Sequence, residues 1–181
     1  PPTHAVVLAN AAEEFYLRVS GTNSEIDFQL TNLVAVTGEV VDVTGTAGDD
    51  TFAFAAGADH QVTVNGVVYG FDSNSVKIVN FAGGTGSDTA TLTGTNGDET
   101  ATLQVGETQL TDGTYTATVF TTENVSLLGG GGYDLASLFD SAGDDTFDAI
   151  PSRASLTGDG FEHHVVDFSR INAYATAGGY D

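Results

Sequence analysis

The stretch GTAGDDTF at residues 45–52 decides the fold, because it occurs twice more along the chain in closely related form. Its relatives are GTNGDETA at residues 94–101 and DSAGDDTF at residues 140–147, so the copies start 49 and 46 residues apart. Self-similarity at a nearly constant period is the sequence signature of a repeat architecture. The sequence therefore predicts a repeat protein with a unit of about 47 residues.

A second glycine-rich motif marks the other end of each unit. It reads GGTGSD at residues 83–88, GGGGYD at residues 129–134 and AGGYD at residues 177–181. Short stretches of alternating apolar residues flank it, and such alternation indicates half-buried strands. They lie at residues 76–79, 125–128 and 171–174 before the motif, and at residues 89–92 and 135–138 after it.

Each unit also contains a hairpin signal between its two motifs. Asn65-Gly66 lies between the alternating segments 62–64 and 67–69, and Asn-Gly in this setting is the strongest short-range signal for a hairpin. Asp112-Gly113 takes this place in the second unit, and Gly158-Asp159-Gly160 in the third.

Spacing and composition predict an all-β fold, specifically a parallel β-helix (β-solenoid) with about two coils per repeat of 46–49 residues. The strong chiral preference of parallel connections makes a right-handed coil the expectation. Phe52 and Phe147 should then occupy equivalent inward positions, with Ala101 in the middle copy. The alternative is a β-sandwich of successive hairpins, which periodicity disfavours because sandwich strands need not repeat in sequence.

We expect one continuous domain. Residues 1–44 form an N-terminal partial repeat or cap, with strands predicted at 15–20, 25–30 and 33–36, and residues 45–181 form the solenoid. The chain stops at Asp181 inside the second motif, which predicts continuation or stacking on another chain. The three solenoid repeats cover about residues 45–93, 94–139 and 140–181.

Charge limits the possible partners. The chain has 25 acidic and 4 basic residues, and a formal charge of −21. Such a surface repels nucleic acid and anionic membranes and attracts cations. No apolar run approaches the roughly 20 residues of a membrane helix, so no membrane span is expected.

Carboxylates in the Gly-rich turns are the candidate metal ligands, because Ca²⁺ prefers hard oxygen ligands from loops. The competing interpretation is that these side chains only cap turns through hydrogen bonds to the backbone. Carboxylates on equivalent corners of adjacent coils would approach closely and repel, which favours a bound cation. This effect is modest for solvated corners two coils, about 10 Å, apart, where it amounts to about 0.4 kcal/mol in water. The candidate calcium ligands are Asp49, Asp50, Asp88, Asp98, Glu99, Asp134, Asp144 and Asp145.

The sequence predicts no enzyme, because these carboxylates recur with the unit whereas a catalytic site is usually unique. His163 and His164 are adjacent and should point to opposite faces of a strand, so they cannot jointly bind one ion. Because parallel β-helices often host carbohydrate chemistry, the alternative function is a carbohydrate-binding or carbohydrate-active β-helix.

These motifs resemble the repeats of two protein families. The segments at residues 83–91 and 129–137 resemble the glycine-rich nonapeptide of hemolysin-type calcium-binding β-rolls, and that resemblance implies a glycine turn with a calcium-binding Asp. The whole unit, over residues 33–181, is similar to Gly-Asp-rich repeats of very large secreted and cell-surface proteins of bacteria. This second resemblance implies an extracellular structural or adhesive role. We expect a filament subunit that stacks end to end and is stabilised by calcium, with surface glycans as a second class of partner.

Overall fold

The computed structural model describes residues 32–180, and the strands predicted at residues 15–20 and 25–30 lie outside this range. Leu33–Asp181 forms one compact unit. Its regular structure consists of sixteen strands, with no helix among the described residues. No described helix is therefore long and apolar enough to cross a membrane.

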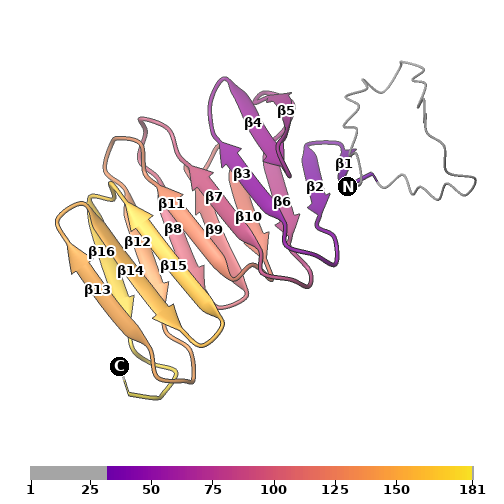
Figure 1. The fold of residues 1–181 in the computed structure, drawn as a ribbon. Helices are drawn as coiled ribbons and strands as arrows, with labels where there is room; N and C mark the ends of the chain where they lie inside the picture. Colours follow the sequence, from indigo (N-terminus) through magenta and orange to yellow (C-terminus); the bar gives the residue numbers. More distant parts are fainter. Residues whose placement is uncertain (1–31, 181) are drawn as a thin grey trace, which may run out of the picture. The chain divides into compact units, whose positions relative to one another are not determined.

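The strands form a β-solenoid of two facing sheets, each with eight strands (Figure 1). The first sheet contains, in spatial order, β1 (Val34–Thr37), β2 (Val40–Thr44), β6 (Ile78–Ala82), β10 (Thr116–Phe120), β9 (Glu107–Thr111), β8 (Thr100–Gln104), β12 (Leu135–Phe139) and β16 (Arg170–Tyr174). The second contains β13 (Thr146–Ile150), β14 (Arg153–Gly158), β15 (Phe161–Val166), β11 (Asn124–Leu128), β7 (Thr89–Thr93), β3 (Thr51–Ala55), β4 (Asp59–Val64) and β5 (Val67–Asp72).

Each repeat unit contributes five strands in a fixed order. The first three form an antiparallel meander in one sheet, the fourth crosses to the other sheet, and the fifth returns to the sheet of the meander. The first unit is β3 to β7, the second is β8 to β12, and the third begins at β13 and has reached its fourth strand, β16. Because the fourth and fifth strands alternate between sheets, the meanders of successive units lie in opposite sheets.

Parallel pairing joins neighbouring coils by two rules. The fifth strand of a unit pairs with the first strand of the same unit, as β7 does with β3 and β12 with β8. The fourth strand lies between the fifth strand of the preceding unit and the third strand of the following unit, as β6 does between β2 and β10, and β11 between β7 and β15. Stacked parallel coils therefore confirm the β-solenoid rather than a sandwich of successive hairpins.

All three predicted hairpins are present, and each joins the second and third strands of a meander. Asn65-Gly66 connects β4 to β5 with positive φ at both residues, as a tight hairpin requires. Residues 112–115 and 159–160 connect the equivalent pairs. The sequence did not reveal the other hairpin of each meander, which turns at residues 56–58, 105–106 and 151–152.

The core fills the space between the sheets with alternate residues of each strand. The rings of Phe52 and Phe81 stack across it with their centroids 4.7 Å apart. Phe52 is 3% exposed and Ala101 is fully buried, as expected. Phe147 pairs with the inward Leu156 but is 44% exposed, because β13 is the last strand of its sheet and nothing covers it among the described residues.

Candidate functional site

The first acidic corner lies where β2 leads into β3 and β6 leads into β7. The backbone N–H of Asp50 donates to Asp88 Oδ1 at 2.8 Å, and the N–H of Ser87 donates to Asp49 Oδ1 at 2.8 Å. The structure thus brings Asp49, Asp50 and Asp88 together from turns 38 residues apart. The two turns are directly stacked coils, so these carboxylates lie closer than the two-coil separation expected from the sequence.

Glu123 extends this corner by one coil, and the sequence did not single it out. The N–H of Asp88 donates to Glu123 Oε2 at 2.8 Å, so Glu123 takes towards Asp88 the role that Asp88 takes towards Asp50. A sequence signal for it exists. Three successive parallel strands of the second sheet directly follow an acidic residue, namely Asp50 before β3, Asp88 before β7 and Glu123 before β11.

The second corner repeats this arrangement in the opposite sheet. The N–H of Glu99 donates to Asp134 Oδ1 at 2.8 Å, and the N–H of Tyr133 donates to Asp98 Oδ1 at 2.8 Å. Asp98, Glu99 and Asp134 therefore form the counterpart of the first corner. Asp88 and Glu99, which are close in sequence, lie at opposite ends of β7 and belong to different corners.

The third corner is where β12 leads into β13. Asp145 accepts hydrogen bonds from the N–H and the hydroxyl of Ser141, at 2.6 and 2.9 Å. The N–H of Tyr180 donates to Asp144 Oδ1 at 2.9 Å. Asp144 and Asp145 thus occupy the positions of Asp49 and Asp50.

Every corner also contains the hydrogen bonds expected from turn capping. Asp50 Oδ2 accepts from the N–H and the hydroxyl of Thr46, at 2.6 and 3.0 Å, and Glu99 Oε1 accepts the same pair from Thr95 at 2.7 and 2.6 Å. Asn65 Nδ2 adds a bond of 2.6 Å to Asp50 Oδ1. The carboxylates therefore satisfy backbone donors that strands cannot satisfy where the chain turns.

Glycine five residues before the acid makes room for the stacked carboxylates. A Cβ at Gly83 would lie 2.4 Å from Asp88 Oδ2 and 2.6 Å from the carbonyl oxygen of Thr121. At Gly129 the distances would be 2.4 Å to Asp134 Oδ2 and 2.6 Å to the carbonyl oxygen of Asp167. The double-glycine motif thus has a packing reason in addition to its turn geometry.

Three carboxylate oxygens at the corners are buried without a hydrogen-bond partner: Asp88 Oδ2, Glu99 Oε2 and Asp134 Oδ2. Burial raises the pKa of Asp88, and the negative charges of Glu123 and Asp50 raise it further. Burial also raises the pKa of Glu99, and the neighbouring carboxyl of Asp134 raises it further. At Asp50, burial acts in the same direction, but hydrogen bonds from Asn65 and Thr46 outweigh it and lower the pKa. The pKa values of the neighbouring carboxyls Asp88 and Asp50 are therefore shifted in opposite directions.

No group of three His, Cys, Asp or Glu side chains converges on a metal position within residues 32–180. Each of the first two corners supplies two stacked buried acids, Asp50 with Asp88 and Glu99 with Asp134. Ca²⁺ takes 6–8 oxygen ligands, so most would have to come from backbone carbonyls and water. The donor chemistry suits Ca²⁺, but the carboxylates alone do not complete a site.

The two adjacent histidines face opposite sides of β15, as predicted. His163 is buried, and burial lowers its pKa to about 4. His164 points outwards, with its Nε2 2.9 Å from Glu162 Oε1. Neither arrangement joins the two rings at one ion.

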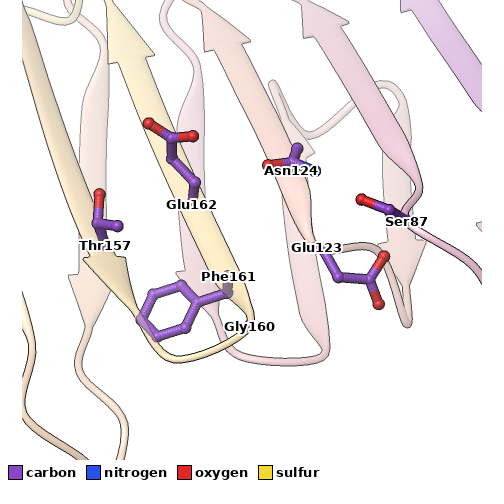
Figure 2. A pocket seen from close by; sticks show the side chains of 7 residues that line it. All are labelled: Ser87, Glu123, Asn124, Thr157, Gly160, Phe161 and Glu162. Carbon is purple, nitrogen blue, oxygen red and sulfur yellow. The ribbon is translucent and has the colours of Figure 1, made fainter.

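A shallow depression of about 300 Å³ lies on the second sheet beside the first corner, and Figure 2 shows its lining side chains. Two carboxylates contribute to it, Glu123 at the start of β11 and Glu162 on β15. The backbone links these residues, because the N–H of Glu162 donates to the carbonyl oxygen of Glu123 at 2.8 Å. The lining consists of Ser87, Glu123, Asn124, Thr157, Gly160, Phe161 and Glu162.

Comparison with known proteins found no matching family model, no similar curated protein and no similar solved structure.

Proposed function

We propose that this chain is a non-catalytic structural module of an extracellular or cell-surface assembly, built from β-solenoid units that stack end to end. The observation that carries the proposal is the sharing of strands between units. The fourth strand of each interior unit is held between strands of its two neighbours. A unit of this kind gains its stability by joining others.

The ends of the sheets support the same proposal. Among the described residues, β1 and β16 end the first sheet, and β5 and β13 end the second. Unpaired strand edges recruit other strands, and natural monomers usually block them. Exposed apolar residues accompany these edges, namely Val36 on β1 and Phe147 and Ile150 on β13.

The distribution of polar groups also favours a structural role. The buried acids recur in register at successive corners, and their first task is to hold one coil on the next. The extracellular location rests on the similarity of the unit to repeats of secreted bacterial proteins. The charge of −21 suits a surface that stays dispersed in water and contacts cations.

Concentration-dependent assembly tests the proposal. Sedimentation velocity and negative-stain electron microscopy of the full chain, over a wide concentration range, should show multiples of the chain that grow into thin fibres. A single monomeric species at the highest concentration would overturn the structural role proposed here.

We further propose that Ca²⁺ stabilises the corners. The observation in its favour is the burial of unpartnered oxygens on Asp88, Glu99 and Asp134, which a cation would satisfy. A ligand that binds only the folded state raises the midpoint of unfolding. Thermal unfolding in Ca²⁺ should therefore occur at a higher temperature than in a chelator, with Mg²⁺ as the control cation. Identical midpoints would contradict this part of the proposal.

The alternative function, carbohydrate binding, would use the depression around Glu123 and Glu162, because this acid pair occurs only once in the described chain. Glycan-array binding that Glu162→Gln abolishes, and that the exposed variant Glu107→Gln leaves intact, would favour the alternative. Hydrolysis of a polysaccharide, lost in the same variant, would show a carbohydrate-active enzyme.

A further inference from the structure

We infer that the two ends of the solenoid are complementary, so that a second copy of this chain continues both sheets in a defined register. In this junction, β16 of one copy pairs with β5 of the next, and β13 pairs with β2 after β1 has moved away. The inference rests on the end-to-end stacking proposed above and names the strands that form it.

The first half of the junction follows from the pairing of fourth and third strands. Inside the chain, β6 pairs in parallel with β10, with Val79 opposite Ala117. The fourth strand β11 pairs with β15 in the same way, with Val125 opposite His163. Val79 and Val125 are equivalent inward residues of fourth strands, and Ala117 and His163 are equivalent inward residues of third strands. The two interior examples therefore have the same register.

β16 and β5 each lack the partner that this rule assigns. Within residues 32–180, β16 is a fourth strand with no third strand beyond it, and β5 is a third strand with no fourth strand beside it. Transferring the interior register places Ile171 opposite Val67 and Ala173 opposite Tyr69 of the second copy. All four side chains then point into the core, as their interior counterparts do.

The second half follows from the pairing of first and fifth strands. Phe52 on β3 lies opposite Ala90 on β7, and Ala101 on β8 lies opposite Ala136 on β12. In the part of the chain that the structure describes, β13 is a first strand without a fifth strand, whereas β2 has the position of a fifth strand beside β6. The rule places Phe147 opposite Val41 of the second copy.

β1 occupies the edge of β2 where a first strand would lie. It pairs antiparallel with β2, with Val36 opposite Val41, through a two-residue turn at Gly38 and Glu39. Interior first strands pair in parallel with fifth strands, so β1 is a substitute for the strand that β13 would provide. β1 is also short and, among the described strands, pairs with β2 alone, and 55% of Val36 is exposed. Displacing it exchanges a four-residue pairing for a five-residue one.

Apolar side chains at both ends favour the junction. Phe147 on β13 is 44% exposed and Ile171 on β16 is half-buried, although both are on inward-facing positions. At the other end, Tyr69 and Phe71 pack only partly against the core. Joining the ends removes this apolar surface from water.

One pair of facing carboxylates destabilises the junction and makes its stability depend on ions. The register places Asp148 of β13 opposite Asp42 of β2 on the outer face, and like charges directly opposite each other destabilise a sheet. Added salt or a divalent cation should therefore strengthen the assembly.

Cysteine crosslinking tests the first half, because the chain contains no cysteine. Asn172→Cys in one chain and Val68→Cys in another face each other on the outer side in the inferred register. Neighbouring strands lie about 4.8 Å apart, which suits a disulfide. Mild oxidation of the mixture should give a 172–68 linked dimer, identified by peptide mass spectrometry. The matched control is Ser126→Cys, the interior counterpart of Asn172, which should give no link because β15 occupies its edge.

A second pair tests the displacement of β1. Asp148→Cys and Asp42→Cys should crosslink between chains if β13 pairs with β2. Asp148→Cys and Ala35→Cys should crosslink instead if β13 adds to an undisplaced β1, because Ala35 lies opposite Asp42 in the hairpin. The second result would overturn the inferred displacement.

The outcomes separate this inference from the proposed function. Fibres that form without the 172–68 link would overturn the register and leave end-to-end stacking in place. Absence of any assembly would overturn both.

Discussion

The segment GDDTF occurs twice, at residues 48–52 and 143–147, and its two copies differ in burial. In both, the second Asp accepts hydrogen bonds from the Thr or Ser four residues earlier, and Phe points towards the core side of a first strand. Phe52 is 3% exposed because β3 lies between β4 and β7, whereas Phe147 is 44% exposed because, among the described strands, β13 has only β14 beside it. Identical local sequence gives the same turn and side-chain direction, but the neighbouring coil decides burial.

The largest expected effect comes from removing the buried ring of Phe52, which we compare with removing the exposed ring of Phe147. Phe52→Ala should lower the free energy of unfolding by about 3–5 kcal/mol, because it leaves a cavity beside Phe81. Phe147→Ala should cost less than about 1 kcal/mol in the monomer, since its ring packs incompletely. Urea unfolding at low protein concentration measures both. Equal losses would show that the end of the solenoid is as closed as its interior.

Glycine variants sharpen the comparison at the stacked corners. Gly83→Ala should destabilise the protein by about 1–3 kcal/mol, because its Cβ would overlap Asp88 and the carbonyl of Thr121. Gly48→Ala is the matched control, since the nearest atom to its Cβ would be Thr46 Oγ1 at 3.8 Å. Thermal unfolding of both variants provides the measurement. A control variant as unstable as Gly83→Ala would contradict the steric explanation.

Asn65 stabilises the first corner with two hydrogen bonds. Its side-chain amide donates to Asp50, and its side-chain oxygen accepts from the N–H of Thr51. Asn65→Gly keeps the positive φ and should cost about 1 kcal/mol at neutral pH through the lost hydrogen bonds. Because Asn65 lowers the folded-state pKa of Asp50, its contribution is present above the unfolded pKa and is lost as the pH falls through the folded one. The difference between variant and wild type should shrink at acidic pH. A constant difference from neutral to acidic pH would exclude this linkage.

The smallest expected effect concerns Glu99. Its folded pKa is raised by burial and by Asp134, so the folded state retains the proton more strongly than the unfolded state. This contribution to stability is present below the unfolded pKa and is lost as the pH rises through the folded pKa. Without divalent cations, Glu99→Gln should be more stable than wild type at neutral pH and should change less on acidification.

The exposed variant Glu107→Gln is the control for net charge, and unfolding temperatures at two pH values in a chelator measure the effect. In the presence of Ca²⁺, the Glu99→Gln variant distinguishes whether a proton or a calcium ion neutralises the Glu99 carboxylate in the folded protein. Loss of the calcium-dependent shift together with lower stability in Glu99→Gln would favour calcium at the second corner.

The sequence by itself determined the repeat, the strands around each motif, the turns at the two motifs and one of the two hairpin turns of each meander. These features depend on local chemistry. Asn-Gly accepts positive φ, Asp accepts hydrogen bonds from nearby N–H groups, and alternation orients side chains. All eight candidate acids therefore lie in turns, as predicted. Turns without Gly at the positive φ gave no such signal, as with Thr121 (φ 47°) and Ser152 (φ 79°). The turn at residues 105–106 was also missed, because Val precedes Gly106 (φ 82°) where Asn or Asp would mark a hairpin.

Only the tertiary structure decided which coils meet. The exchange of sheets between successive units, the pairing of Asp50 with Asp88 across 38 residues and the inclusion of Glu123 depend on which strand edges and inward side chains remain free. The burial that raises the pKa of Glu99 likewise comes from the stacked turn of Asp134. These properties depend on contacts between neighbouring coils, and the exposure of Phe147 follows from the lack of a neighbouring coil beside β13 among the described residues.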